Sequence, residues 1–451
     1  MLNFLKHRAV YLNLLFLLLA SFLFLSSPLN AATYYVARSD SSASDSNSGS
    51  EASPWKTIQK AANTLVAGDT VYVKVGIYQE LYAGFPTSYN PAIKPQKSGT
   101  AGNYITYMAY PGDSVIIDQQ YKGGIFYVEK SYIKISGFEL RNGMGGIVTS
   151  GNASHIIIEN NNIHDMDAVH GANNGGIYFT PCSYCQVRNN SIHDIYVNGT
   201  NTQFIDGANS SAIHSYNMEF ITIENNEFYN VYNGVFHKSS SGKTGALIKG
   251  NLIHDVTRGL FYDVMGSGDD PHINQRVTGN IIYNAKSGIA LAAHSYDTAG
   301  RVNDGFKVWN NVIVASDGGI GVNNAKNVEI YNNIIVGPTK YAGFATQDGV
   351  LFNYFDNNIY FNVSKWATDV YITGKEKYYY SFAAWQAGSG FDANSLSENP
   401  NFVNAATHDY HIKTGSAVVG RNGVYIGAYP TGSEVVGITT KPKPPTNFKL
   451  L

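Results

Sequence analysis

Several side chains that can exchange protons gather in the middle of the sequence. They are His214, Tyr216, Lys238, Arg258, Asp263 and His272. Such a set can remove a proton next to a carboxylate, because that reaction needs a base, a cation for the enolate-like charge and an acid for a leaving oxygen. Lys238 or His214 is the candidate base, and Arg258 or a calcium ion is the candidate charge stabiliser. Tyr216 or His272 is the candidate acid. A lysine can act as a base only if burial or neighbouring cations lower its pKa.

Other side chains near this set suit the binding of a sugar chain. Three aromatic residues that we expect on the outer surface could stack beneath sugar rings: Tyr178, Phe236 and Phe261. His294 and Arg301 lie in a long excursion and are expected to contact substrate at the groove wall. Asp269 and Asp270 are candidate calcium ligands, because calcium prefers carboxylate oxygens. Asp263, Asp269 and Asp270 could instead supply the two or three carboxylates that a glycoside hydrolase needs on one face, so hydrolysis is a second possible activity.

An internal repeat indicates the elements that must position these residues. Each unit has a short β-branched strand that ends in an asparagine, and these asparagines are Asn161, Asn190, Asn226, Asn251, Asn280, Asn311, Asn333 and Asn358. Their spacing varies from 22 residues (Asn311 to Asn333) to 36 residues (Asn190 to Asn226), as expected if loops of variable length leave one face of a coil. Strands this short cannot bury their apolar face alone, so we predict an all-β fold of parallel coils stacked roughly 4.8 Å apart. The asparagines should form a ladder at one turn, where their side chains tolerate left-handed backbone.

The alternation of the strand after each asparagine predicts which side chains face the core. The apolar residues expected inside are Ile177, Ile213, Val235, Leu260, Ile289, Ile320 and Phe344. The neighbouring outward column is Tyr178, His214, Phe236, Phe261, Ala290 and Gly321. Because parallel strands in register place equivalent residues on adjacent coils, Lys238 should lie between Tyr216 and Asp263. Chemistry is therefore expected on the middle coils, since the later coils carry alanine and glycine.

The N-terminal part of the chain shows a strand, an amphipathic helix and a second strand, at Tyr34-Tyr-Val, Trp55-Lys-Thr-Ile-Gln-Lys-Ala-Ala and Thr70-Val-Tyr-Val. This order resembles the N-terminal region of bacterial right-handed β-helix proteins, including pectate-lyase-like enzymes. Asn399-Pro-Asn-Phe-Val-Asn and Asp409-Tyr-His-Ile resemble the closing segment of the same group. The resemblance implies a single-stranded right-handed parallel β-helix (solenoid) over residues 33–430, with an N-terminal capping helix within 33–80. The coils would span about 100–365 and the closing segment about 379–430.

Two short motifs resemble those of enzymes that act on uronates. His237-Lys-Ser-Ser resembles the Lys-Ser-Ser segment of the alginate lyase and chondroitinase B family, which implies that Lys238 is the base. That family would have an arginine where this sequence has Asp263, so Arg258 would have to take its role. Asp270-Pro-His resembles the Asp-Pro-His motif of mannuronan C5-epimerases, which remove the same proton and return one from the opposite face.

Bulk properties limit the partners and the location. The formal net charge of -2 excludes a nucleic-acid binder that works through bulk charge, so an acidic polysaccharide would have to be held by local cations. Lys6 and Arg8 precede an apolar run from Leu12 to Leu25, which predicts a signal peptide over residues 1–32. We therefore expect a secreted monomer with no membrane span in the mature chain. The proline-rich residues 431–451 are expected to form a tail or linker.

Two further patterns are expected to be structural. Cys182 and Cys185 should form a local disulfide in an oxidising compartment. Three histidines recur at one position of the repeat, each followed by an aspartate, and they are His164, His193 and His254. We interpret them as turn structure in which the carboxylates bond backbone amides, with Tyr229 interrupting the series.

The sequence favours an enzyme, specifically a lyase that cleaves a uronic-acid-containing polysaccharide by β-elimination, with calcium as the candidate cofactor. A mannuronan-type C5-epimerase or a glycoside hydrolase is the alternative. A non-catalytic glycan-binding or surface-structural protein is a further alternative, because parallel β-helices also serve as adhesins and stalks. The concentration of reactive residues on the middle coils favours the enzyme over the stalk.

Overall fold

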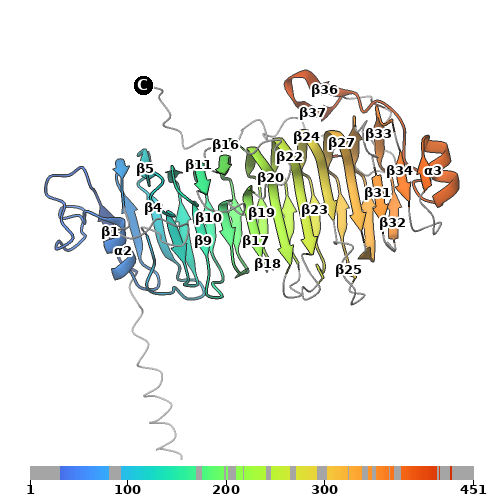
Figure 1. Ribbon diagram of the computed structural model, residues 1–451. Coiled ribbons are helices and arrows are strands. Elements are labelled where there is room, and N and C mark those ends of the chain that lie inside the picture. The colour runs from blue at the N-terminus through green and yellow to red at the C-terminus, as the bar shows by residue number, and fades with distance from the viewer. Residues whose placement is uncertain are drawn as a thin grey trace, which may run out of the picture.

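The protein is an elongated solenoid of stacked β-coils (Figure 1). The computed structural model describes residues 31–80, 93–168, 175–197, 200–201, 210–216, 218–239, 245–264, 271–291, 302–323, 325–337, 344–347, 352–364, 366–369, 377–413, 416 and 427–428. The predicted signal peptide and the proline-rich tail lie outside these residues, apart from Ala31 and Ala32. Among the described helices, none is long and apolar enough to cross a membrane.

One flank of the solenoid is a 12-stranded sheet in which each strand pairs with the equivalent strand of the next coil. Its strands, in order, are β1 (Thr33–Val36), β2 (Thr70–Val73), β4 (Ile105–Ala109), β7 (Ile133–Ser136), β10 (Ile157–Glu159), β14 (Gln186–Arg188), β19 (Thr222–Glu224), β21 (Leu247–Lys249), β23 (Arg276–Thr278), β26 (Lys307–Trp309), β29 (Val328–Tyr331) and β32 (Phe352–Asp356). All pairs within this sheet are parallel, as the repeat predicts.

The rest of each coil belongs to a 19-stranded sheet. Its strands are β3 (Gly76–Tyr78), β5 (Val115–Asp118), β6 (Phe126–Val128), β8 (Glu139–Arg141), β9 (Ile147–Thr149), β11 (Asn162–Ala168), β12 (Gly175–Phe179), β15 (Ser191–Val197), β16 (Thr200–Asn201), β17 (Ser211–Tyr216), β20 (Glu227–Ser239), β22 (Leu252–Val264), β24 (Ile281–Leu291), β27 (Val312–Asn323), β30 (Ile334–Val336), β31 (Phe344–Gln347), β33 (Ile359–Phe361), β34 (Ala367–Asp369) and β35 (Lys377–Tyr379). Its long strands serve two parts of the coil: the start of β20 pairs with β15, and its end pairs with β17. Three strand pairs complete the described sheets: β13 (Cys182–Ser183) with β18 (Met218–Glu219), β25 (Asn303–Asp304) with β28 (Ala325–Lys326), and β36 (Phe402–Asn404) with β37 (Asp409–Ile412).

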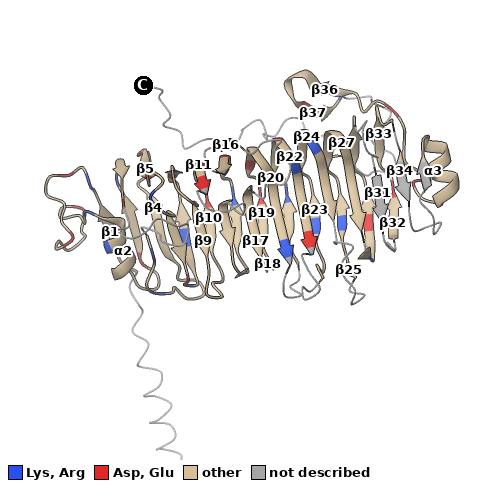
Figure 2. Cartoon of the chain, in the orientation of Figure 1, with Lys and Arg blue, Asp and Glu red and all other residues tan. Residues whose placement is uncertain are grey.

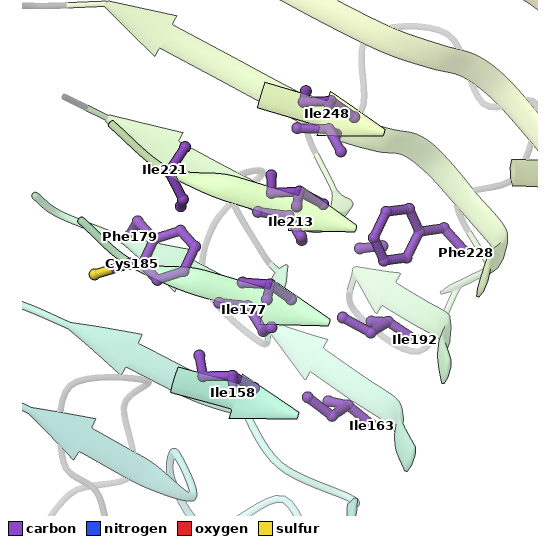
Figure 3. Close-up of a cluster of buried hydrophobic side chains, with 14 of the residues drawn as sticks. Ile158, Ile163, Ile177, Phe179, Cys185, Ile192, Ile213, Ile221, Phe228 and Ile248 are labelled. Atoms are coloured by element: carbon purple, nitrogen blue, oxygen red, sulfur yellow. The ribbon is translucent and has the colours of Figure 1, made fainter. Parts of the chain in front are cut away.

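The hydrophobic core fills the inside of the coils. The predicted inward residues pair from coil to coil, so that Ile177 lies beside Ile213 and Ile213 beside Val235. Figure 3 shows how aliphatic side chains of successive coils stack, with Ile163, Ile192 and Phe228 forming a second row. The predicted alternation is confirmed, because a one-residue slip would have turned this whole set outward.

The asparagine ladder is confirmed over its full predicted length. Each side-chain amide donates to the Oδ1 of the asparagine on the next coil, from Asn161 to Asn190 (3.0 Å) through to Asn333 and Asn358 (3.1 Å). The left-handed residue is not the ladder asparagine, however, but the residue before it, such as Asn160 (φ 57°) or Gly250 (φ 63°). That residue makes the turn, and the next asparagine can then point inward, where it is buried.

A short helix lies at the N-terminal end of the stack. Helix α2 (Ile58–Thr64) begins after Thr57, whose hydroxyl accepts a hydrogen bond from the Lys60 amide (3.1 Å). Ile58 and Ala61 are buried and belong to the main hydrophobic core. Figure 1 places α2 beside β1, at the end where the predicted cap is needed. That α2 closes the stack remains a prediction, as do the domain boundaries.

Near the C-terminal end of the stack, helix α3 (Phe382–Ser389) lies close to the last coils (Figure 1). Asp392, just after α3, ends the asparagine ladder, because it accepts hydrogen bonds from Asn358 (3.1 Å), Tyr360 (2.8 Å) and Trp385 (2.7 Å). The chain then turns back, through a 3-10 helix (Ala405–Thr407), and the hairpin β36–β37 packs Tyr410 against apolar residues on the outside of the coils.

Candidate active site

The outward column predicted from the alternation is present in the structure. Strand register places side by side, from one coil to the next, Tyr178, His214, Phe236, Phe261, Ala290 and Gly321. Two residues further along the strands, Lys238 lies between Tyr216 and Asp263. These residues therefore share one wall. We call the group of Tyr178, His214, Tyr216, Phe236, Lys238, Arg258, Phe261 and Asp263 the lysine cluster.

The lysine cluster is more buried than the sequence indicated. Lys238 and Phe236 are each 1 % exposed, and His214 is fully buried. The expectation that Phe236 offers a free ring to a sugar is wrong, because the Lys238 ammonium lies 4.6 Å from the centre of that ring. Phe261 is half-buried, and the Arg258 guanidinium lies 4.3 Å from its ring centre. Two cation–π contacts thus occupy the two rings that were expected to stack on substrate.

Lys238 is held beside the hydroxyl of Tyr216. Its Nζ donates to the Tyr216 hydroxyl oxygen over 3.4 Å, a long hydrogen bond, and lies 5.5 Å from the centre of the Tyr216 ring. Burial lowers the pKa of Lys238, and the nearby Asp263 carboxylate opposes this effect only in part. The amine is thus closer to neutral than an exposed lysine. A lowered lysine pKa is what a base at this position requires.

The rings around Tyr216 fix its place. His214 packs against Tyr178 (5.0 Å between ring centres), Tyr216 (5.3 Å) and Phe236 (5.1 Å). Tyr178 is half-buried and also meets Tyr216 edge to face at 6.1 Å. His214 is therefore central to the packing of the cluster.

Arg258 brings a second cation to this wall. It is half-buried, and it pairs in register with Asn233 on one side and Ser287 on the other. Figure 2 shows basic residues on β22 and β24, which are Arg258 and Lys286. A cavity of about 500 Å³ begins on β24 and is lined by residues 284–286 and 314–316. On β24 this cavity ends one residue before Ser287, the register partner of Arg258.

His272 lies inside the coil, so its predicted role as an acid in the groove is wrong. It is fully buried, its Nε2 is 3.2 Å from the backbone oxygen of Asp263, and its ring lies 4.6 Å from that of His237. Its backbone amide donates to the side chain of Asn303 (2.9 Å), which draws this segment inward. Burial lowers the pKa of His272 to about 4. His272 is therefore a neutral interior residue.

Sequence reasoning missed the role of His237. As the inward neighbour of Lys238, it is buried and its Nδ1 lies 2.8 Å from the Ser215 hydroxyl. Burial, with His272 and His214 nearby, lowers the pKa of His237 well below its usual value. The two-residue period of the strand could have predicted this position, because Val235 and His237 must face the same side. The interior neighbours of Lys238, the candidate base, are therefore the neutral side chains of His237 and Ser215.

The recurring histidines form a continuous stack on another part of the coils. Its rings, which we call the histidine column, are His164, His193, Tyr229, His254, Tyr283 and His408, with centres 4.1–5.0 Å apart. Tyr229 continues the series instead of interrupting it. The aspartates do occupy left-handed turns, as in Asp165 (φ 53°), but their carboxylates bond histidine Nδ1 instead of backbone amides. This pairing identifies the histidines as structural.

The metal prediction has no support among the described residues. Asp269, Asp270, His294 and Arg301 all lie outside them. Within the described part of the chain, no group of three or more histidine, cysteine, aspartate or glutamate residues could hold a metal ion. Asp263 faces the Lys238 ammonium, and the histidine-column aspartates are bonded to imidazoles. The described donors therefore do not fit calcium. Cys182 and Cys185 do form the predicted disulfide.

Two family models match parts of the chain. One is described as the Pel9A-like right-handed beta helix region and matches residues 34–223. The other is described as a periplasmic copper-binding protein (NosD) and matches residues 199–408. Among curated proteins, the uncharacterized protein YwoF of Bacillus subtilis (strain 168) is 28% identical over 138 residues. That match covers 27% of this chain and 27% of YwoF, so it spans about a quarter of the relative.

Two solved structures of carbohydrate-active proteins are similar to parts of this chain. The crystal structure of pectate lyase Pel9A is 16% identical, with a TM-score of 0.53, over 88% of this chain and 96% of that one. The catalytic unit of the GH87 alpha-1,3-glucanase from Streptomyces thermodiastaticus strain HF3-3 is 14% identical, with a TM-score of 0.45, over 76% of this chain and 67% of that one. The strand register and the Pel9A-like match over residues 34–223 together show that the chain has a right-handed parallel β-helix fold.

Proposed function

We propose that the protein is a secreted enzyme that cleaves a uronic-acid-containing polysaccharide by β-elimination at the lysine cluster. One observation carries this proposal: a lysine whose pKa is lowered by burial lies in hydrogen-bond contact with a tyrosine hydroxyl, on the wall that carries Arg258. The cluster supplies the base, acid and cation that elimination needs. The fold shared with a pectate lyase supports an acidic polysaccharide as the partner.

In the proposed reaction, the neutral amine of Lys238 takes the proton from C5 of a uronate. The electron pair of the C5–H bond forms the C4–C5 double bond, and the C4–O bond to the leaving sugar breaks. Arg258 stabilises the negative charge that develops on the carboxylate. Tyr216 donates its hydroxyl proton to the leaving oxygen, and after the product leaves, the ammonium of Lys238 can reprotonate Tyr216 across their re-formed contact. Asp263 favours the ammonium that Lys238 becomes.

Substrate must reach an amine that is 1 % exposed. We expect the sugar to replace the contact between Lys238 and Tyr216, because a 3.4 Å hydrogen bond is weak and Tyr216 is only half-buried. His214 was the alternative base. Since it is fully buried and in contact with three aromatic rings, we assign it the role of positioning Tyr216.

The proposal is tested by absorbance at about 235 nm, the signal of the unsaturated uronate that elimination forms. Alginate, polygalacturonate and glycosaminoglycans should be compared, and we expect at least one to respond. Lys238→Ala should abolish the signal. Lys307→Ala is the matched control, because Lys307 is a surface lysine on the other sheet, paired with Glu329 (2.8 Å).

Other outcomes would replace the proposal. Uptake of deuterium at C5 from heavy water, with no absorbance change, would indicate an epimerase. New reducing ends without unsaturation would indicate a hydrolase. Binding with no chemical change would indicate a glycan-binding protein. Equal absorbance from wild type and Lys238→Ala would remove Lys238 from the reaction.

A further inference from the structure

One turn of the solenoid carries different residue types on the earlier and the later coils. The residue at this turn has a left-handed backbone. Its amide donates to the backbone oxygen of the residue that precedes the equivalent turn on the next coil, as Tyr184 does to Glu219. The later coils place glycine or asparagine there, namely Gly245, Asn274, Gly305 and Asn327. Four earlier coils place rings there instead: Tyr132 (φ 58°), His155 (φ 56°), Tyr184 (φ 58°) and Phe220 (φ 50°). We call these four residues the ring ladder.

Rings are costly at this position. Left-handed backbone suits glycine and asparagine, whereas a bulky side chain there carries steric strain. Such strain persists when the rest of the structure, or a function, requires it. The later coils show that the turn itself can be made without rings. The ring ladder therefore calls for a separate explanation.

The ring ladder is continuous and reaches solvent. Its ring centres are 4.4 Å apart between Tyr132 and His155, and 5.0 Å apart at each of the next two steps, with ring planes within 20°. Tyr184 is 50 % exposed and Phe220 is 44 % exposed, which places them among the most exposed large apolar side chains that the structure describes. The described protein thus presents a row of rings with one ring per coil.

The disulfide fixes the most exposed ring. Cys182 and Cys185 flank Tyr184 and are fully buried, so the bond closes a loop whose outer residue is this tyrosine. The Tyr184 amide donates to the Glu219 backbone oxygen (2.9 Å), and the Ser183 hydroxyl donates to the Glu219 carboxylate (2.9 Å). Tyr184 is therefore held in place before any partner binds, which lowers the entropic cost of binding.

Polar groups run beside the rings. The hydroxyls of Ser131 and Ser154 lie 3.1 Å apart on neighbouring coils, and the carboxylate of Glu219 follows two coils later. Aromatic surface next to hydroxyl and carboxylate groups suits a sugar, which has apolar C–H surfaces and a rim of hydroxyls. A step of one coil is about the length of one pyranose unit in an extended chain, so successive sugars could meet successive coils.

We propose that the ring ladder is a binding surface for a polysaccharide chain, separate from the lysine cluster. It lies six residues further along the coils that carry Tyr178 and His214. The surface would hold the polymer near the enzyme while another stretch of polymer is cleaved. The proposal rests on the proposed function only for its choice of ligand class, because the surface itself needs no catalysis.

The test is electrophoresis of the full chain through native gels that contain alginate, polygalacturonate or xylan. We expect at least one polymer to retard the wild type. The double variant Tyr184→Asn, Phe220→Gly should weaken this retardation by about tenfold, as expected when two exposed aromatic contacts are lost. Its melting temperature should not fall, because the new residues suit the left-handed turn. Tyr380→Ala, which removes another exposed tyrosine (66 %), is the matched control.

Retardation of the double variant equal to that of the wild type would overturn the proposal, as would the absence of retardation in all three gels. As a check that needs no loss of a ring, Tyr184→Trp should change its fluorescence when the retarding polymer is added, and an unchanged spectrum would contradict the proposal. Lys238→Ala should still be retarded. Loss of catalysis with retained binding, or the reverse, therefore separates this proposal from the proposed enzyme activity.

Discussion

Strands β20 and β22 each pass through two opposite environments. Their first halves carry Tyr229 and His254 of the histidine column, where carboxylates lie against the imidazoles. Burial alone would lower the pKa of His164 in this column, but Asp165 and Glu139 outweigh it and raise the pKa to about 9. Their second halves carry the lysine cluster, where burial lowers the pKa of Lys238. A positive charge is thus stabilised at His164 in the histidine column and penalised at Lys238 in the lysine cluster.

This difference separates a structural role from a catalytic one. The histidines of the column are paired, and their recurrence at each coil follows from the repeat. The lysine cluster instead buries a cation at a cost in folding stability, an arrangement typical of functional sites. Substitutions in the lysine cluster should therefore change turnover, whereas substitutions in the histidine column should change stability.

The largest effect is expected from Lys238→Met. Removal of a general base should lower kcat by about 10³-fold. Folding should not suffer, because a buried amine is replaced by an apolar side chain of similar length. Turnover on the responding polyuronate and thermal unfolding measure the two effects. A variant that loses stability but keeps its turnover would give Lys238 the same structural role as the histidine column.

Tyr216→Phe should reduce kcat by about 10²-fold, because the acid for the leaving oxygen is lost while the ring packing is kept. A substrate with an aryl leaving group needs less protonation, so it should recover most of the rate. Comparison of the two substrates is the measurement. An equal loss on both would show that Tyr216 does not protonate the leaving oxygen.

His254→Ala should act on stability and not on turnover. It leaves Glu227 (3.2 Å) and Asp255 (2.7 Å) without their imidazole and opens a gap between Tyr229 and Tyr283. We expect a loss of about 2 kcal/mol in the free energy of unfolding. Urea unfolding gives this value, and turnover of the folded variant should match the wild type. His254→Phe, which keeps the stack, should lose less.

The smallest effect concerns pH. The pKa of His164 is higher in the folded chain than its usual 6.5, so its contribution to stability is complete below pH 6.5 and is lost as pH rises through about 9. We expect this loss to be on the order of 1–2 kcal/mol. Unfolding of wild type and His164→Phe should be compared at pH 6 and pH 9.5. The variant should show a smaller drop, and an equal drop would assign the effect to other groups.

The sequence predicted the register of the solenoid but not the burial of its outer wall. The repeated asparagines and the two-residue alternation fix which residues share a column, because any slip would expose the core. Burial of Phe236 depends on where the Lys238 chain folds over it, and the alternation contains no information about that. The alternation therefore predicts that Phe236 points outward, but not that Lys238 covers its ring.

Other errors have distinct causes. The residues before His272 do not follow the repeat, so the strand alternation does not predict which way its side chain points. The change of residue type at Tyr229 predicts an interruption, which is wrong because any flat ring can continue a stack. Helix α3 lies within the predicted closing segment. Its ends carry recognisable signals, because the Ser381 hydroxyl caps its start and the left-handed Gly390 ends it.

The central claim is that Lys238 removes the proton from C5 of a uronate. A polyuronate labelled with deuterium at C5 tests it directly, because elimination and epimerisation must both break that bond. The wild type should release the label into water, and Lys238→Met should not. Shortening of the polymer with the label retained, or equal release by the variant, would contradict it.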